Sequence, residues 1–423
     1  MYYLKRKNGD MDKEIRDSKR KMEKLNVDEK KCRNSQQIKI LFVSHEFSIG
    51  GSTVSLVSLI QGLRNYSGIE VKVLLPYKKG KEGKAARLFN DNGICYEEVW
   101  YRRNFKSISE KYYLKYRIFD LLNIFAVKRI QKYIQKGNFD IVCSNSTGVD
   151  VGARAAQLAG VPHIYYVREM MKAGLNCEYR NKKRMKKLLE SAEYVIFISK
   201  ATENYHMVEF RLKNTIQFYD GFILQDYYID KHDILKKKKI SFVQMGTFSD
   251  EKGTLNTIEL LYQLNQNGIS NWTMEFVGEG TEEYVRKMKR FIEKYHLELQ
   301  ITIGEFCLDI KNKLSQKDIL IMNSKAEGFG RVTVEGMLAG CLVIGRYLGG
   351  TTEIIIDRIN GIAFEKDEEF LREIQEIVAN REIYRKLAKD GQKYAIEKFD
   401  CTNTAPKFVK VAKRVIETEG HYG

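Results

Sequence analysis

The segment AEGFGRVTVEGMLAG, residues 326–340, carries the residue types and spacing best suited to chemistry in this sequence. It follows the apolar run DILIMN, which predicts a β-strand, and its glycine-rich loop leads into a helix that should begin near Arg331. Backbone N–H groups at a helix start suit a phosphate, and the helix dipole adds about 0.3–1 kcal/mol. Glu335, about one turn into the helix, could accept both hydroxyls of a ribose. The same segment is also compatible with an ordinary strand–turn–helix whose glutamates are solvated helix caps.

Several motifs around this loop, taken together, resemble the donor-site signature of the retaining GT-B glycosyltransferases. The nearest match is glycosyltransferase family 4, the group 1 transferases. The Glu–x7–Glu spacing around EGFG is followed here by AGCLVIG, GGTTE and DRINGIAF. The matching positions are Glu327, Gly328, Phe329, Gly330, Glu335, Gly349, Gly350, Glu353, Asn360 and Gly361. This combination is much more specific than a lone GxGxxG.

A second stretch, FVQMGTFSDEKGTLNTIELL, resembles the strand and loop with which the family grips the donor diphosphate. The matching positions are Gly246, Lys252 and Gly253. Lys252 is suited to neutralise phosphate charge, although a solvated loop lysine would look the same. Thr247 stands where the family has arginine, so a hydroxyl replaces a bidentate cation. Either another cation takes over, Arg331 being a candidate, or donor binding is weakened.

The N-terminal half matches the family more loosely. HEFSIGGSTVSL, residues 45–56, resembles its first strand–Gly-Gly–helix turn. There Gly50 and Gly51 would let the backbone approach the donor phosphate or the reacting sugar, and a plain turn into a capped helix is the alternative. VPHIYYVREMM resembles the strand that carries a catalytic-site histidine in many relatives. Arg168 stands near that position and is the better candidate, whereas His163 is more typical of a packed strand residue.

The elements that must position these residues follow an α/β pattern. Short, continuous apolar runs alternate with helix-periodic stretches from Ile38 onward, as in parallel sheets covered on both faces. The resemblance covers about residues 38–395 and implies a GT-B fold, with two Rossmann-like α/β/α domains facing each other across a cleft. We expect a charged N-terminal extension (1–36), an acceptor-side domain (37–222), a linker (223–239), a nucleotide-sugar donor domain (240–395) and a C-terminal helix (396–423) that could cross back to the N-terminal domain.

The resemblance also implies an activity. The chain would be a retaining glycosyltransferase that moves a sugar from a nucleoside-diphosphate sugar to a saccharide or lipid-linked acceptor, in cell-surface polysaccharide synthesis. The expected catalytic residues are Glu327, Lys252 and Arg168. The expected donor-binding residues are Gly50, Gly51, Gly246, Thr247, Lys252, Glu327, Gly328, Phe329, Gly330, Arg331 and Glu335. The sugar nucleotide is a co-substrate, and neither a cofactor nor a metal is expected, because lysine and helix dipoles supply the positive potential.

Each role follows from what such an enzyme must stabilise. Lys252 and the backbone amides of residues 328–330 would stabilise the leaving diphosphate. Glu335 would hold the ribose, and Glu327 would orient the sugar hydroxyls. Arg168 would complete the site from the opposite domain. Two other functions on this fold remain open: a non-catalytic module that recruits a partner transferase, and a sugar-nucleotide epimerase.

The charge of the chain indicates which classes of binding partner it favours. The formal net charge is +17, which favours an anionic partner, although a solvated lysine-rich surface is the alternative. Two N-terminal segments, 101–119 and 179–189, each carry six Lys/Arg, and the first adds six aromatic residues. They suit an anionic membrane surface, and solvated helix faces are again the alternative. No RNA-binding signature accompanies them, so we expect no nucleic acid.

Targeting and metal signals are also weak. No apolar run approaches the ~20 residues that span a bilayer. The N-terminus is charged from its fifth residue, unlike a secretory signal. We therefore expect a cytoplasmic protein that could sit at the inner face of the plasma membrane. The seven cysteines lack CxxC spacing and the six histidines lack HExxH, so we expect reduced thiols and no metal site.

Overall fold

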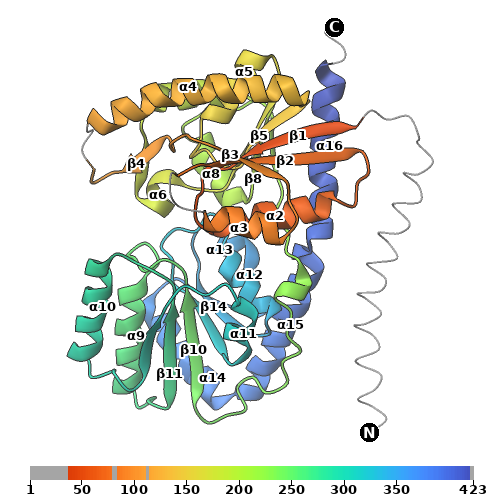
Figure 1. Cartoon of the computed structure of the whole chain (residues 1–423). Helices are drawn as coiled ribbons and strands as arrows, with labels where there is room; N and C mark the ends of the chain where they lie inside the picture. Colours follow the sequence, from red (N-terminus) through yellow and green to blue (C-terminus); the bar gives the residue numbers. More distant parts are fainter. Residues whose placement is uncertain (1–36, 79–82, 111–113, 420–423) are drawn as a thin grey trace, which may run out of the picture.

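The computed structural model describes residues 37–78, 83–110 and 114–419, so the expected extension over 1–36 lies outside the described residues. Two parallel α/β units lie one above the other in Figure 1. The first is built on a seven-stranded sheet of order β3-β2-β1-β5-β6-β8-β9, and the second on a six-stranded sheet of order β12-β11-β10-β13-β14-β15. The expected α/β class and GT-B architecture are confirmed.

The strands of the N-terminal sheet are β1 (Ile38–Val43), β2 (Ile69–Pro76), β3 (Tyr96–Val99), β5 (Ile141–Ser144), β6 (His163–Val167), β8 (Tyr194–Phe197) and β9 (Thr215–Gln217). Its helices are α2 (Gly51–Leu63), α3 (Lys84–Asp91), α4 (Leu114–Gly137), α5 (Val151–Ala159), α6 (Met171–Leu175), α7 (Lys182–Glu190) and α8 (Lys200–Met207). Phe42 illustrates the register, since it pairs with Val73 of β2 on one side and Cys143 of β5 on the other. Helices cover both faces of the sheet, which is why its central strands are apolar throughout.

The strands of the C-terminal sheet are β10 (Ile240–Met245), β11 (Trp272–Val277), β12 (Ile301–Gly304), β13 (Ile319–Met322), β14 (Leu342–Arg346) and β15 (Ile362–Phe364). Its helices are α9 (Thr254–Gln266), α10 (Glu282–Lys294), α11 (Ile310–Ser315), α12 (Arg331–Leu338), α13 (Thr351–Ile354), α14 (Asp367–Ala379) and α15 (Arg381–Phe399). The glycine-rich loop lies between β13 and α12, at the carboxyl end of a central strand. Ligands of such sheets bind at that edge.

Two segments join the units. The chain at 223–239 contains a short 3-10 turn (Leu224–Asp226) and then packs on the C-terminal unit, where Ile234 and Leu235 are buried. It is therefore less of a polar linker than its sequence indicated. The last helix, α16 (Cys401–Glu419), returns along the N-terminal unit, as Figure 1 shows. Its Phe408 ring lies 5.4 Å from that of Phe42 in β1.

No helix within the described ranges combines the length and the apolar character needed to cross a membrane. Also within those ranges, no three His, Cys, Asp or Glu side chains converge in a way that could hold a metal ion.

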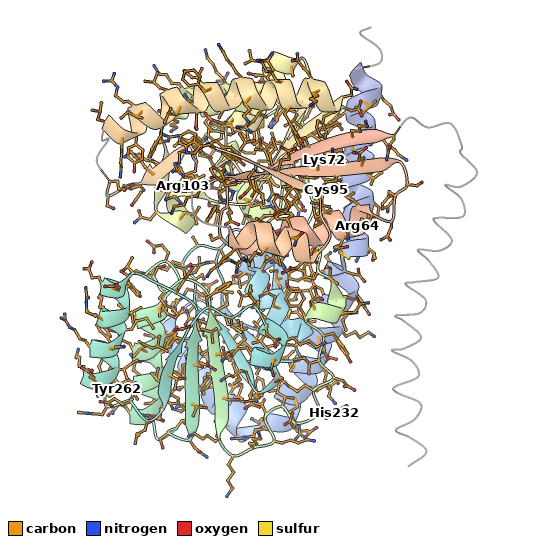
Figure 2. The ribbon with its side chains drawn as sticks, viewed as in Figure 1. Arg64, Lys72, Cys95, Arg103, His232 and Tyr262 are labelled. Carbon is orange, nitrogen blue, oxygen red and sulfur yellow. The ribbon has the colours of Figure 1, made fainter. Side chains whose placement is uncertain are left out.

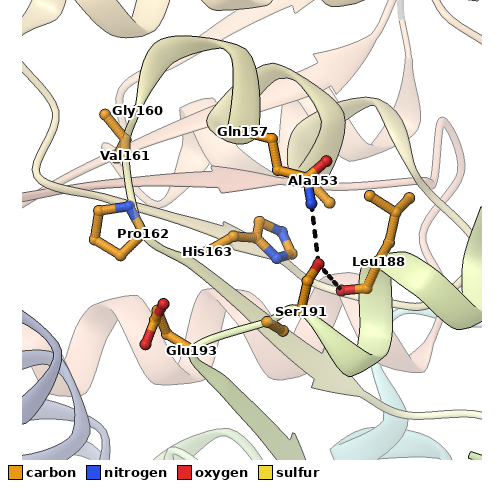
Figure 3. Close-up of a pocket in the computed structure, with 10 residues that line it drawn as sticks. Ala153, Gln157, Gly160, Val161, Pro162, His163, Leu188, Ser191 and Glu193 are labelled. Atoms are coloured by element: carbon orange, nitrogen blue, oxygen red, sulfur yellow. Dashed lines mark hydrogen bonds between the residues drawn. The ribbon is translucent and has the colours of Figure 1, made fainter.

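His163 lies at the amino end of β6, beside a cavity of about 270 Å³ (Figure 3). The ring is buried, and its Nε2 atom lies 2.8 Å from the Ser144 hydroxyl. Burial lowers the pKa of His163 to about 3, so the ring stays neutral near pH 7. The glycine-rich loop lies at the opposite, carboxyl edge of the other sheet. This position supports the packed-residue interpretation of His163.

The depressed pKa predicts a pH-dependent stability. Below about pH 6.5 the unfolded state binds a proton at His163 that the native state does not bind until about pH 3. The free energy of unfolding should therefore fall with acidification, by up to about 1.4 kcal/mol per pH unit from this group. Urea unfolding of His163→Asn at pH 7.5 and 5.5 should show a smaller loss than the wild type. The exposed His232 (Figure 2) provides the control variant, His232→Asn, which should behave as the wild type. Equal losses in His163→Asn and the wild type would contradict the prediction.

Candidate functional site

The glycine-rich loop is held by contacts between backbones. The Gly350 amide donates to the Glu327 carbonyl at 2.6 Å, and a Cβ on Gly349 would lie 2.5 Å from the same oxygen. On the other side, a Cβ on Gly328 would lie 2.7 Å from the Arg168 carbonyl of the N-terminal unit. Only glycine fits such close approaches. The EGFG and GGTTE motifs are therefore one packed structure, wedged between the two sheets.

Gly330 ends the loop in a left-handed conformation, with φ of 96°, and caps α12. The helix begins at Arg331, as expected, so its N-terminus adjoins the loop. Glu335, one turn in, is 4% exposed. Burial raises the pKa of this carboxyl, while the Arg331 guanidinium, 3.5 Å away, opposes that rise. The glycine-rich loop, the start of α12 and the Glu335 carboxylate therefore lie close together along the chain segment that the sequence indicated.

Lys252 and Glu327 meet at this helix start. The Lys252 Nζ atom lies 2.5 Å from Glu327 Oε2, and both side chains are only partly buried. Lys252 precedes Gly253, the residue that caps α9, and the Gly253 backbone packs against the Asn323 carbonyl at the end of β13. The two strand-end loops, after β10 and β13, therefore present a cation and a carboxylate side by side. Lys252 is not the isolated solvated lysine that its loop position alone would allow.

Gly246 and Thr247 lie at the end of β10. Gly246 has φ of 130°, and its backbone packs tightly against Gly278, which ends β11. Thr247 is exposed. It presents a hydroxyl at the surface and no positive charge, so Lys252 is the cation that this loop offers.

Arg331 spans the two units. Its guanidinium donates to the Ser55 hydroxyl of α2 at 2.8 Å and to the Tyr227 hydroxyl at 3.3 Å, and it covers the Phe222 ring at 4.1 Å. Gly51, at the start of α2, lies beside it, since a Cβ there would be 3.5 Å from Arg331 Cδ. The guanidinium is thus engaged between the sheets. A Cβ on Gly51 would make only ordinary contact with Arg331, whereas a Cβ on Gly50 would lie 2.4 Å from Glu46 Oε1.

Arg168 is buried rather than aimed at open space. Its Nη1 atom lies 2.5 Å from Asp220 Oδ1, and its Nε donates to the Asn145 side chain at 2.9 Å. Asp220 also accepts from the Ser55 hydroxyl at 2.7 Å, which links this ion pair to Arg331. Only the Arg168 carbonyl reaches the glycine-rich loop. This geometry favours a positioning role, and a catalytic role for Arg168 stays an untested prediction.

The side chain of Phe329 is buried, so its expected part in donor binding falls to its backbone amide and stays an untested prediction. Its ring is 2% exposed and stacks on Tyr219 of the N-terminal unit at 5.5 Å. The Phe399 ring meets it edge-on at 5.6 Å. The side chain therefore belongs to the core between the units. Burial there removes the apolar phenyl ring from water, which lowers the free energy of the folded state. The backbone amide of Phe329 remains beside the helix start.

Two contacts across the units involve residues that the sequence analysis did not assign to the site. The Ser199 hydroxyl donates to the Gly328 carbonyl at 2.5 Å. The Glu353 carboxylate accepts from the Lys200 and Ala201 amides, at 2.9 and 2.7 Å, and so caps α8 from the other sheet. The GGTTE motif, which holds Glu353, was visible in the sequence. The two contacts were not, because they join segments more than 120 residues apart.

The two basic segments meet in a short antiparallel ribbon, β4 (Phe105–Ser107) with β7 (Cys177–Tyr179). Lys106 pairs there with Glu178 at 2.7 Å. Arg180 and Arg184 both pair with Asp120 of α4. Lys106, Arg180 and Arg184 are thus engaged in pairs within the fold. Seven other described basic residues of the two segments are exposed: Arg103 (Figure 2), Lys115, Arg117, Lys182, Lys183, Lys186 and Lys187.

The aromatic residues of 101–119 are also largely internal. Tyr101, Phe105 and Tyr116 are each buried, with 1–7% exposure. The expectation that aromatic side chains of this segment meet a lipid interface is therefore wrong for these three. Tyr101 packs in the core between α4 and the sheet, where large rings gain most from burial. Residues 111–113 of the segment lie outside the described ranges.

Comparisons with known proteins match both halves of the chain to glycosyltransferases. The family model "Glycosyl transferases group 1" matches residues 228–394, and "Glycosyltransferase Family 4" matches residues 49–217. An uncharacterized glycosyltransferase of Methanocaldococcus jannaschii is 24% identical over 354 residues, 82% of this chain and 90% of that protein. The amylovoran biosynthesis glycosyltransferase AmsD of Erwinia amylovora is 22% identical over 203 residues, 47% of this chain and 56% of AmsD.

Among solved structures, Anabaena HepE in complex with UDP and glucose has a TM-score of 0.71 and 20% identity, over 91% of this chain and all of HepE. This likeness shows the shared fold. The two family models together cover every strand of the two sheets except β1, and the motifs of the loop described above. The chain belongs to the group 1 glycosyltransferases of family 4, and is a retaining, nucleotide-sugar-dependent glycosyltransferase of GT-B fold.

Proposed function

We propose that this protein transfers a sugar from a UDP-sugar bound at the N-terminus of α12. The observation that carries the proposal is the Lys252–Glu327 pair at that helix start, with the buried Glu335 one turn further on. The diphosphate would contact Lys252, the sugar would contact Glu327, and the ribose would contact Glu335. HepE, whose structure holds UDP and glucose, supports uridine as the nucleoside.

The reaction separates an anomeric carbon from a phosphate oxygen, and negative charge grows on the leaving diphosphate. Lys252 and the amides at the start of α12 stabilise that charge, because they already point where it develops. Glu327 then orients the sugar hydroxyls next to the breaking bond. Glu335 accepts the ribose hydroxyls; burial raises the pKa of its carboxyl, and the Arg331 guanidinium opposes that rise.

The acceptor is proposed to be a saccharide or a lipid-linked saccharide of a cell-surface polysaccharide. AmsD, named for amylovoran biosynthesis, supports that direction. The protein would then work in the cytoplasm, at the inner face of the plasma membrane. A non-catalytic module and an epimerase are the other functions that this fold allows, and product analysis separates them.

The nucleotide can be identified by thermal stabilisation with UDP, GDP, ADP and their sugars, because ligands that bind only the native state raise its stability. We expect the largest shift with UDP and its sugars. Glu335→Gln should lose most of that shift, about tenfold in affinity, since a charge-assisted hydrogen bond becomes a neutral one. Glu373→Gln is the matched control, because Glu373 is also buried and paired with an arginine, outside the loop. An unchanged shift in Glu335→Gln would remove the ribose role.

The Lys252–Glu327 pair can be divided by measuring UDP binding and UDP-sugar hydrolysis separately. Lys252→Met should weaken UDP by about tenfold or more, because a charge-assisted contact to phosphate is lost. Glu327→Gln should bind UDP within about threefold of the wild type yet hydrolyse UDP-sugar about a hundredfold more slowly. Lys313→Met, which breaks the 2.7 Å pair with Glu275 elsewhere in the same unit, should change neither.

The products decide among the alternatives. Release of UDP and free sugar in equal amounts supports a transferase using water as acceptor. A changed sugar still attached to UDP would indicate an epimerase. Binding of UDP without any turnover, with and without acceptor candidates, would favour the non-catalytic module.

A further inference from the structure

The outward face of α4 carries an apolar stripe. The helix spans Leu114–Gly137, and its opposite face is buried against the N-terminal unit. The stripe residues recur at helical spacing and are 39–71% exposed: Leu114, Ile118, Leu121, Leu122 and Phe125. Five large apolar side chains grouped on one exposed helix face are unusual for an isolated soluble protein and mark an interaction surface.

The same face becomes basic further along the helix. At 100° per residue, the exposed side chains of Lys128, Arg129, Lys132 and Lys136 project within about 60° of the stripe's centre. The helix carries six Lys/Arg and one acid, Asp120, which pairs with Arg180 and Arg184 of the neighbouring basic segment. The α4 face, defined as the stripe with these four basic residues, is therefore apolar at one end and cationic at the other.

We propose that the α4 face docks on the surface of an anionic lipid bilayer, with the stripe inserted among the headgroups and the basic residues on lipid phosphates. An amphipathic helix lying in the interface needs apolar depth and cations together. A protein partner fits less well, because lysine is depleted at protein–protein interfaces, and three of the four basic residues are lysines. The proposal goes beyond the donor-site chemistry and does not depend on it.

The position of the helix makes such docking compatible with the rest of the fold. Figure 1 shows α4 along the side of the N-terminal unit that faces away from the C-terminal unit. Its first turn lies at the same side of the molecule as β4 and α6. A bilayer against this face would touch the N-terminal unit alone. The glycine-rich loop between β13 and α12, on the other unit, would remain away from the membrane.

The test is flotation of the full chain with vesicles of neutral phosphatidylcholine, and with the same lipid containing one third phosphatidylglycerol. We expect binding to the anionic vesicles, weakened by salt. Lys128→Gln/Lys132→Gln should lower the partition coefficient by about thirtyfold at low ionic strength, because each cation near such a surface contributes about a factor of five. Leu121→Gln/Phe125→Gln should lower it by about tenfold or more, because the stripe loses apolar area.

Matched control variants distinguish binding through the α4 face from nonspecific binding through positive charge or exposed apolar residues elsewhere on the protein. Lys289→Gln/Arg290→Gln removes the same charge from exposed positions on α10 of the other unit. Val208→Gln/Leu299→Gln removes apolar residues that are 91% and 96% exposed. Both control variants should bind anionic vesicles as the wild type does. All four variants should keep the wild-type thermal midpoint and UDP-sugar hydrolysis, since none touches the core or the donor loop.

A spectroscopic measurement tests insertion directly. Phe125→Trp should gain fluorescence that brominated lipid quenches in anionic vesicles, whereas Leu299→Trp should not. Quenching at Phe125→Trp, with binding lost only in the α4 variants, would support the proposal. Absence of vesicle binding, equal losses in the control variants, or unquenched Phe125→Trp would overturn it. A dimer that Leu121→Gln/Phe125→Gln dissociates, without vesicle binding, would assign the face to a second copy instead.

Discussion

The close backbone packing around Glu327 is the constraint on which the rest of the site depends. Its carbonyl accepts from Gly350, and the glycines on either side leave no room for a Cβ. This packing fixes the start of α12 with little freedom. A fixed helix N-terminus and a fixed carboxylate cost no reorganisation when charge develops, which is how preorganised sites stabilise a leaving group.

The two units are held together near that loop by polar contacts and by the packed rings of Phe329, Tyr219 and Phe399, and at a distance by α16. Ser199 reaches the Gly328 carbonyl, Glu353 caps α8, and Arg331 reaches Ser55. These bonds are individually modest, each about 0.5–1.5 kcal/mol, or more where charge is involved. The buried Arg168–Asp220 pair supports this arrangement from inside the N-terminal unit.

Much of this was predictable from the sequence, and the exceptions have physical reasons. The central strands were found because burial on both faces makes them continuous apolar runs. The edge strand β3, YEEV, is half polar, and β15 has only three residues, so neither reads as a continuous apolar run. The glycine and glutamate motifs located the donor loop. The burial of Phe329 and of Arg168 could not be read from them, since the partners, Tyr219 and Asp220, are distant in sequence.

The most direct measurement of the central claim is a crystal structure of the full chain grown with UDP. We predict that the diphosphate lies at the N-terminus of α12, with Lys252 Nζ in contact with a phosphate oxygen and the ribose hydroxyls on Glu335. This prediction would be contradicted by UDP bound at any other place, including the cavity beside His163. UDP bound at α12 with Lys252 and Glu335 both turned away from it would contradict it equally.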